Sequence, residues 1–208
     1  KKFSPAFKHE IVFFDIALSA KTVNLTTGCD AVCVFVNDKI DEDTIIALAK
    51  NGIKAILLRC AGFNNIDIAA AKKANIKVLR VPAYSPEAVA EHALALILTL
   101  NRKTHKAFNR VRENNFSIEH LVGFNLHGKT IGIIGTGLIG QSFPKIMNGF
   151  GCKILAYDIQ ENEDLTSRGV IYVSLEQLIQ ESDIISLHCP LVPETQYLIN
   201  SETINNMK

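Results

Sequence analysis

The chain has 208 residues, of which 48% are hydrophobic, a length and composition that allow one large or two small hydrophobic cores. Its 22 basic and 21 acidic residues leave a formal net charge of +1 without long blocks of one sign. This balance argues against nucleic acid or an anionic membrane as a partner and favours a small molecule. The longest apolar stretch, HALALILTL, is far shorter than the roughly 20 residues of a membrane-spanning helix. The N-terminal KKFSPAFKHE also lacks the apolar core of a signal peptide.

Cysteine usage bounds the redox environment and the metal chemistry. The five cysteines form neither CxxC pairs nor a spacing with histidine that suits zinc. The chain is also too long for a disulfide-stapled miniature protein. We therefore expect reduced thiols, no metal site and a cytoplasmic protein. The cysteines are Cys29, Cys33, Cys60, Cys152 and Cys189.

The first part of the chain alternates short apolar runs with helical patterns. Runs such as AVCVFV and AILL are apolar at consecutive positions, as expected for parallel strands covered on both faces. Gly52 falls where the first helical pattern should end. The rhythm predicts a small parallel α/β sheet. Its strands are expected at 10–15, 31–36, 54–60 and 77–82, and its helices at 41–52 and 65–74.

A single long helix is predicted over residues 84–114. Ser85 is a favourable N-cap, Pro86 suits the first helical position, and Glu87 complements the positive end of the helix. Beyond the polar stretch that follows, the β–α rhythm resumes. Strands are expected at 129–135, 153–158, 170–173 and 183–189, and helices at 139–151 and 174–182.

The stretch TIGIIGTGLIG has the spacing of a dinucleotide-binding glycine loop. An apolar strand precedes it and a helical pattern follows it, which is the context that gives the GxGxxG spacing its value. Gly135 permits the tight turn, Gly137 leaves room for a pyrophosphate, and Gly140 lets helix and strand approach. Free N–H groups at the helix start, from Leu138 onward, would then meet the phosphate charge.

Asp158 ends the next apolar strand, 18 residues after Gly140. At this spacing an acidic side chain accepts hydrogen bonds from the adenosine ribose hydroxyls. A solvated carboxylate at a strand end is the alternative interpretation. Against a 2′-phosphate the carboxylate would be a like charge, and Ile159 and Gln160 supply no basic partner. The sequence therefore favours NAD over NADP.

The strand DIISLHC stops at Pro190, and ligands of open α/β sheets lie beyond the carboxyl ends of strands. HCPLVPET should thus line the cofactor cleft. His188 could act as a general acid or base, but a lone histidine at a strand end is more often structural. Cys189 has no activating base nearby in sequence, which argues against a nucleophilic role.

With these residues in place, nearly the whole chain resembles the D-2-hydroxyacid dehydrogenase family. CDAVCVFVND, LRCAGFNNID and SLHCPLVPET carry the resemblance together with the glycine loop and RVPAYSPEAVAEHALALILTLNR. The glycine loop is shared with many dehydrogenases, whereas RCAGFNNID and RVPAYSPEAVAEH are specific. The resemblance implies two doubly wound parallel-sheet domains joined by the long helix. The substrate domain would cover residues 1–86 and the dinucleotide-binding domain residues 87–208.

The resemblance also assigns roles to individual residues. Backbone groups of Leu138 and Ile139 would contact the pyrophosphate, beside the role already given to Asp158. The other residues border the cofactor cleft or the substrate. Cys189, Pro190 and Thr195 would border the cofactor, Ala61 and Gly62 would offer N–H groups to a substrate carboxylate, and Tyr84 would lie over the substrate.

The catalytic groups implied by the resemblance are an arginine, a glutamate and a histidine, because a cation and a proton donor must meet the carbonyl oxygen. Their motifs are expected C-terminal to SETINNMK, and a first strand is expected before Lys1. No catalytic residue is therefore assigned within these 208 residues, and they are expected to be inactive by themselves.

Three activities remain open at this point. The first is reduction of pyruvate to D-lactate with NADH, which Tyr84 and the RCAGFNN loop favour. The second is a dehydrogenase for another D-2-hydroxyacid, and the third is a noncatalytic NAD-sensing regulator with the same fold. The resemblance further implies a homodimer or higher homo-oligomer, with the helix after Ser85 contributing to the contact.

Overall fold

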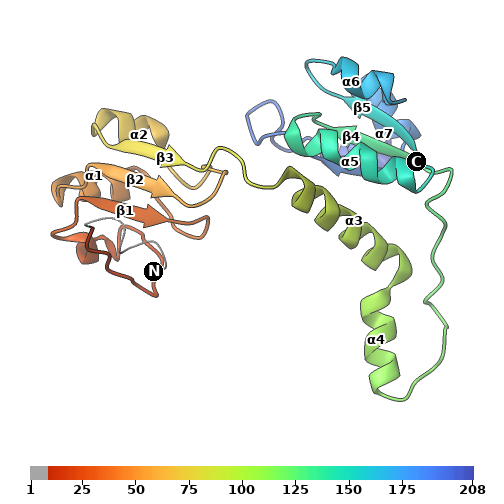
Figure 1. Ribbon diagram of the computed structural model, residues 1–208, viewed down its shortest axis with the longest axis horizontal. Helices are drawn as coiled ribbons and strands as arrows, with labels where there is room; N and C mark the ends of the chain where they lie inside the picture. The colour runs from red at the N-terminus through yellow and green to blue at the C-terminus, as the bar shows by residue number, and fades with distance from the viewer. Residues whose placement is uncertain (1–8) are drawn as a thin grey trace. The chain divides into compact units, whose positions relative to one another are not determined.

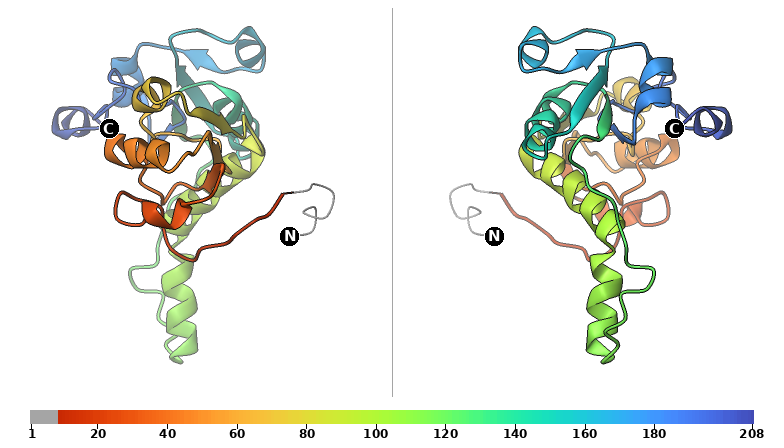
Figure 2. Two further views of the ribbon diagram at one scale, coloured as in Figure 1. Left: turned by 90° about the vertical axis from the view of Figure 1, so that its left-hand side faces the viewer. Right: turned by 90° about the vertical axis from the view of Figure 1, so that its right-hand side faces the viewer.

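The computed structural model describes residues 9–208 and divides the chain into two compact units, Lys1–Tyr84 and Ser85–Lys208. Each unit combines helices with a parallel sheet, as Figure 1 and the two further views in Figure 2 show. The α/β fold class predicted from the sequence is therefore confirmed. Among the helices of residues 9–208, none has the length and apolarity needed to cross a bilayer.

The first unit has a three-stranded sheet in the order β1-β2-β3, with all strands parallel. Val34 and Ile56 on one face of the sheet share a core with Ile45 of α1 and Ala71 of α2, so both helices cover that face. Gly52 has φ +85° just after α1, as its predicted place at a helix end requires. The elements are the 3₁₀ helix η2 (Val23–Thr26), β1 (Ala31–Val34), α1 (Glu42–Lys50), β2 (Ala55–Leu58), α2 (Ile68–Lys73) and β3 (Lys77–Arg80).

The opposite face of this sheet carries a row of exposed apolar side chains. Cys33 pairs in register with Leu57, and Leu57 with Leu79. Leu57 is 39% exposed and Leu79 51% exposed. Among the described residues the first unit thus has one covered and one uncovered sheet face, unlike the two covered faces predicted from the consecutive apolar positions.

The strand predicted at residues 10–15 does not form. The recorded strand pairings of residues 9–208 do not include this segment, and the Ile11 and Val12 side chains are exposed. Its sequence has the right composition, but a strand needs the edge of a neighbouring strand for its backbone hydrogen bonds. The prediction was therefore wrong for this segment.

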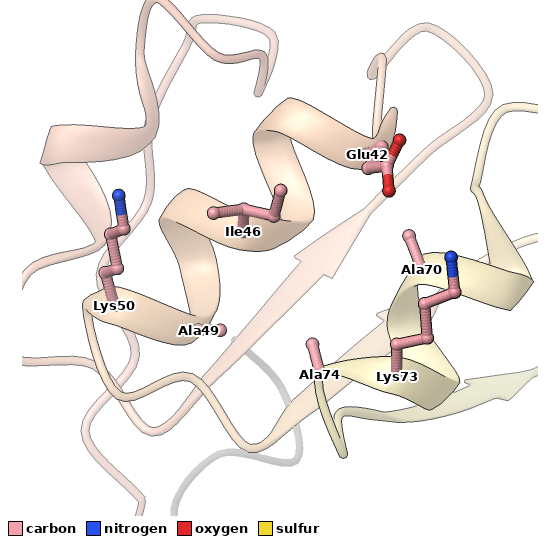
Figure 3. A pocket seen from close by; sticks show the side chains of 7 residues that line it. All are labelled: Glu42, Ile46, Ala49, Lys50, Ala70, Lys73 and Ala74. Atoms are coloured by element: carbon pink, nitrogen blue, oxygen red, sulfur yellow. The ribbon is translucent and has the colours of Figure 1, made fainter.

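A surface groove of about 520 Å³ lies between α1 and α2 (Figure 3). Small and apolar side chains line it, with charged side chains among them. Neither the predicted substrate loop nor Tyr84 contributes to it. The lining residues are Glu42, Ile46, Ala49, Lys50, Ala70, Lys73 and Ala74.

The second unit has a four-stranded parallel sheet in the order β6-β5-β4-β7. The direction of winding reverses at β4, so helices cover both faces, as expected for a doubly wound sheet. Phe143 of α5 shares a core with Ile131 and Ile133 of β4, and Leu178 of α7 packs with Ile134 and Leu155. The elements are α3 (Pro86–Arg102), α4 (Thr104–Arg112), β4 (Thr130–Ile134), α5 (Leu138–Gly149), β5 (Lys153–Tyr157), α6 (Glu163–Ser167), β6 (Ile171–Tyr172), α7 (Leu175–Glu181), β7 (Ile184–Leu187) and α8 (Ser201–Asn205).

The predicted long helix is two helices. Its start is confirmed, because the Ser85 hydroxyl accepts the Ala88 N–H at 3.3 Å and Pro86 is the first helical residue. Lys103, however, has φ +52° and separates α3 from α4. The Lys103 ammonium donates to the carbonyls of His120 and Val122 at 2.9 and 3.2 Å. The segment around residues 120–122 thus contacts the chain at this break, which the local sequence did not predict.

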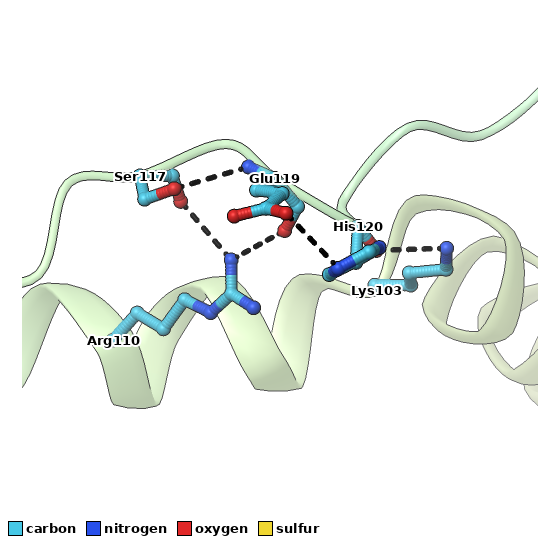
Figure 4. A network of polar contacts seen from close by, with 5 residues as sticks. All are labelled: Lys103, Arg110, Ser117, Glu119 and His120. Atoms are coloured by element: carbon cyan, nitrogen blue, oxygen red, sulfur yellow. Dashed lines mark hydrogen bonds and ion pairs between the residues drawn. The ribbon is translucent and has the colours of Figure 1, made fainter.

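The same returning segment is held along α4 (Figure 4). The Arg110 guanidinium donates to the Ser117 carbonyl at 3.1 Å and to the Glu119 carbonyl at 2.6 Å. At the end of α3 the buried Asn101 side chain bonds both the N–H and the carbonyl of Phe124 at 2.8 Å. Figures 1 and 2 show α4 and this segment extending away from the sheet of the second unit.

Candidate functional site

The glycine loop connects β4 to α5 at the carboxyl edge of the second sheet. Gly135 follows β4 with φ +93°, a conformation that residues with a Cβ rarely adopt. A Cβ at this position would lie 2.6 Å from the Cys189 nitrogen and 2.7 Å from the His188 carbonyl carbon. Glycine is therefore required both by the turn and by the close approach of the chain that leaves β7.

The other two glycines of the loop have opposite surroundings. Gly140 is buried, and a Cβ there would overlap the Gly135 carbonyl oxygen. Gly137 is exposed and has no atom within 4 Å of the place its Cβ would occupy. Gly140 thus serves packing of α5 on the loop, whereas Gly137 keeps open a space that a side chain would fill.

The N-terminus of α5 opens onto the same space. Gly137 is the N-cap and has no side chain to bond the first N–H groups, and the first backbone bond runs from Gln141 to the Gly137 carbonyl at 2.9 Å. In residues 9–208 the N–H groups of Leu138 and Ile139 have no recorded acceptor. Free N–H groups at the positive end of a helix bind anions such as phosphate.

Asp158 directly follows β5 and holds the glycine loop. Its Oδ2 accepts the Thr136 N–H at 2.5 Å and the Thr136 hydroxyl at 3.0 Å. Its Oδ1 accepts a long bond of 3.4 Å from the Gln160 N–H. Burial raises the pKa of this carboxyl, but the hydrogen bonds from Thr136 and from the Gln160 and Ile159 N–H groups together outweigh burial, so the pKa of Asp158 lies below its ordinary value. Oδ1 of the ionised carboxylate, whose bond from the Gln160 N–H is long, can thus accept further donors.

A chain of hydrogen bonds that sequence reasoning missed supports this carboxylate. The Asn162 N–H donates to the Tyr172 hydroxyl, and that hydroxyl donates to the Thr136 hydroxyl, each at 3.0 Å. Thr136 then donates to Asp158, so the donors run in one direction toward the negative charge. Thr136 could have been noticed as a hydroxyl between two glycines. Tyr172 lies on β6, and no motif or spacing in the sequence links it to the loop.

His188 packs as a structural residue. Its Nε2 lies 3.0 Å from the Ser186 hydroxyl, and its ring centroid lies 5.2 Å from that of Phe143. Burial lowers the pKa of His188, which favours the neutral ring near pH 7. These contacts support the structural interpretation over a general acid.

The residues after β7 border the glycine loop. Cys189 is half-buried and packs with the core of Ile134 and Leu178. The Thr195 hydroxyl donates to the Pro190 carbonyl at 2.5 Å and accepts the Val192 N–H at 2.9 Å. Thr195 therefore closes the turn that begins at Pro190.

The predicted substrate loop follows β2 in the first unit. In residues 9–208 no acceptor is recorded for the N–H groups of Ala61 and Gly62. Their carbonyls are bonded, that of Ala61 by the Arg80 guanidinium at 3.0 Å and that of Gly62 by the Cys60 thiol at 3.3 Å. Successive backbone N–H groups in a turn can form an anion-binding concavity. Tyr84 is 69% exposed, and the structure records no hydrogen bond between it and this loop.

The predicted residues thus fall into two groups, one in each unit. All nine predicted cofactor residues lie at or just beyond the carboxyl edge of the second sheet, and Ala61, Gly62 and Tyr84 follow strands of the first. Among residues 9–208, no group of three or more His, Cys, Asp or Glu side chains could hold a metal ion. The nine are Gly135, Gly137, Leu138, Ile139, Gly140, Asp158, Cys189, Pro190 and Thr195.

Comparison with known proteins gives closely similar relatives. A model of the family described as "D-isomer specific 2-hydroxyacid dehydrogenase, NAD binding domain" matches residues 94–208. D-lactate dehydrogenase of Escherichia coli (strain K12) is 51% identical over 203 residues, which cover 98% of this chain and 62% of the relative. The 2-hydroxyacid dehydrogenase A of Aspergillus oryzae is 53% identical over 199 residues, 96% of this chain and 57% of the relative.

Solved structures of D-lactate dehydrogenases have folds similar to that of this chain. The apo-structure of E. coli D-lactate dehydrogenase has a TM-score of 0.89 at 50% identity and covers all of this chain, which spans 67% of that one. D-lactate dehydrogenase from Aquifex aeolicus, complexed with NAD and lactic acid, has a TM-score of 0.80 at 41% identity over 89% of this chain and 56% of that one. The chain spans about three fifths of the length of the curated relatives it matches.

Proposed function

The chain belongs to the D-isomer specific 2-hydroxyacid dehydrogenase family, and from that premise we propose that the protein reduces pyruvate to D-lactate with NADH. The observation that carries the proposal is the open space at Gly137, bordered by free N–H groups of α5 and lying on the loop that Asp158 holds. A dinucleotide fits this donor set, because its pyrophosphate needs N–H donors and its ribose needs an acceptor. When bound, NADH supplies the hydride.

On this proposal the second unit binds and orients the cofactor. The N–H groups of Leu138 and Ile139 bind the pyrophosphate, and Asp158 Oδ1 accepts the ribose hydroxyls. Cys189 and the turn from Pro190 to Thr195 border the cofactor. A 2′-phosphate would meet the Asp158 charge with no adjacent cation, since Ile159 and Gln160 follow it, so NAD is preferred over NADP.

The first unit binds the substrate on this proposal. The free N–H groups of Ala61 and Gly62 bind the carboxylate of the 2-oxo acid, and Tyr84 lies over the substrate. These groups hold the substrate but carry no proton for the carbonyl oxygen. His188 is packed against Phe143 and is not assigned that role. We expect the cation and the proton donor from the family's arginine, glutamate and histidine motifs, which the sequence resemblance places after residue 208.

A second substrate class has a specific observation in its favour. The Aspergillus relative, named only as a 2-hydroxyacid dehydrogenase, is 53% identical, about as similar as the relative named for lactate. Another D-2-hydroxyacid is therefore the alternative substrate.

We also propose that the protein self-associates in the cytoplasm through the outer side of α3. Leu96 is 52% exposed and Leu100 72% exposed, and their i, i+4 spacing places them on one face of the helix. A second copy would bury these leucines, because exposed apolar patches mark association surfaces.

The substrate assignment can be tested on the protein expressed from its whole reading frame. Rates of NADH oxidation would be compared for pyruvate, for a hydroxylated three-carbon 2-oxo acid and for a branched 2-oxo acid, and the chirality of each product determined. We expect the highest kcat/KM with pyruvate and a D-product. A higher kcat/KM with either other acid would identify that class of acid, rather than pyruvate, as the substrate. An L-product would contradict the proposal.

A further inference from the structure

Arg80, the last residue of β3, reaches across to the loop that follows β2. Its Nη1 lies 3.0 Å from the Ala61 carbonyl oxygen and 3.3 Å from that of Pro82. Its guanidinium carbon lies 5.4 Å from the centroid of the Phe63 ring. We propose that Arg80 is a positioning residue that aims the N–H groups of this loop at the substrate carboxylate. The inference rests on the proposed function.

The geometry of the peptide bond gives the reason. In a trans peptide the carbonyl of one residue and the N–H of the next point in opposite directions. The bond from Arg80 to the Ala61 carbonyl therefore turns the Gly62 N–H away from Arg80. Without this bond the Ala61–Gly62 peptide could rotate, because Gly62 is exposed and glycine has wide conformational freedom.

The peptides on either side are fixed in the same manner. The Val81 N–H donates to the Cys60 carbonyl at 3.3 Å, which orients the Ala61 N–H. The Cys60 thiol donates to the Gly62 carbonyl at 3.3 Å, which orients the next N–H. Of the three bonds, only that from Arg80 comes from a charged side chain. A charge-assisted bond is stronger than a neutral one, and it polarises the peptide so that its N–H donates more strongly.

The contacts of Arg80 favour an arginine over a lysine at this position. Its planar guanidinium can donate to two carbonyls while it stacks on an aromatic ring, whereas a lysine ammonium is a compact point charge on a flexible stem. The second carbonyl, that of Pro82, lies two residues before Tyr84. Arg80 thereby ties the carboxylate loop to the segment that carries the other predicted substrate residue.

The test uses the protein expressed from its whole reading frame, with Arg80→Gln and Arg80→Lys compared with the wild type. Lys54→Gln is the matched control, because it removes an exposed cation just before β2, at the amino end of the strands of the same sheet. There Lys54 pairs with Asp30 at 2.8 Å. Steady-state kinetics with pyruvate, inhibition by oxamate, NADH affinity and melting temperature would be measured. Arg80 is exposed, so both variants are expected to fold.

We expect Arg80→Gln to raise the KM for pyruvate and the inhibition constant for oxamate together, by about tenfold or more. Turnover, NADH affinity and melting temperature should change little, because carboxylate binding is common to ground state and transition state. Arg80→Lys should lie between the wild type and Arg80→Gln, and Lys54→Gln should match the wild type.

An unchanged KM in Arg80→Gln, with a wild type that reduces pyruvate, would overturn the positioning role and leave the proposed function intact. A loss of NADH affinity or a fall in melting temperature that accompanies the rise in KM would also overturn it, because that pattern indicates a general structural role. A wild type that neither reduces pyruvate nor binds oxamate would overturn the proposed function and the inference with it.

Discussion

The Thr136 N–H donates to Asp158 Oδ2 at 2.5 Å, so the carboxylate at the end of β5 directly holds the glycine loop at the end of β4. Asp158 thereby has two tasks that use different oxygens. Oδ2 fixes the loop, and Oδ1 is left for the ribose on the proposed function. Both tasks require the ionised form, which the hydrogen bonds to this carboxylate favour.

Replacing Asp158 by alanine should weaken NADH binding by about 1.5–3 kcal/mol, because charge-assisted hydrogen bonds are lost. Asp158→Asn keeps the shape and removes the charge, so it should reduce the preference for NADH over NADPH. Calorimetry with both cofactors measures the two effects. Glu176→Gln, on the exposed side of α7, is the control and should bind like the wild type. Equal affinities of the wild-type protein for NADH and NADPH would rule out the role given to Asp158.

The pH dependence of stability tests the other task of Asp158. Its pKa is lowered in the folded state, so its contribution to stability is fully present above the unfolded value, about 3.9, and is lost as the pH falls through the lower folded value. The wild type should therefore lose its advantage in unfolding free energy over Asp158→Asn as the pH is lowered below about 4. Denaturant unfolding of both proteins between neutral and acidic pH measures this. A difference that stays constant over that range would mean that the charge does not stabilise the loop.

Gly137→Ala and Gly140→Ala should fail in different ways. A Cβ at Gly137 enters open space, so this variant should fold normally and bind NADH at least tenfold more weakly if the pyrophosphate uses that space. A Cβ at Gly140 would overlap the Gly135 carbonyl, so this variant should unfold at a lower temperature. Melting curves and NADH titrations separate the two. Normal NADH affinity in Gly137→Ala would show that the pyrophosphate does not bind in the space at Gly137.

A charge on the outer side of α3 should break self-association. Leu100→Glu puts a carboxylate on the exposed apolar face of the helix, so a dimer that buries this face should dissociate. Ile204→Glu changes an exposed apolar residue of α8 and should leave the assembly intact. Light scattering of the whole protein at micromolar concentration gives the mass. A wild-type monomer, or a Leu100→Glu variant as large as the wild type, would contradict this interface.

Local patterns in the sequence were enough to predict much of the second unit. Ser85 and Pro86 start α3 because capping depends on a few adjacent residues. The glycine loop and Asp158 lie where the strand–loop–helix pattern placed them, since each follows directly on an apolar strand. The structural interpretation of His188 also agrees with its packing.

The remaining features depend on contacts between residues far apart in sequence. Lys103, at which the predicted helix breaks, donates to the carbonyls of residues 120 and 122. The sequence around Lys103 has a helical composition and does not predict this break. Residues 10–15 have strand composition, yet pairing requires a neighbouring edge. The fold brings Tyr172 to the glycine loop and Arg80 to the loop after β2. No spacing rule connects either residue to its loop in the sequence.

Pyruvate-dependent oxidation of NADH, followed at the nicotinamide absorbance, tests the central claim most directly. Residues 1–208 alone would be compared with the protein from the whole reading frame, and binding of NADH to both measured in parallel. On the proposed function, the residues placed here bind cofactor and substrate but supply no proton to the carbonyl oxygen, a contribution of about 10²- to 10⁴-fold. The account predicts that both proteins bind NADH and that only the longer one forms D-lactate. Sustained turnover by residues 1–208, or a longer protein that binds NADH and reduces no 2-oxo acid, would contradict it.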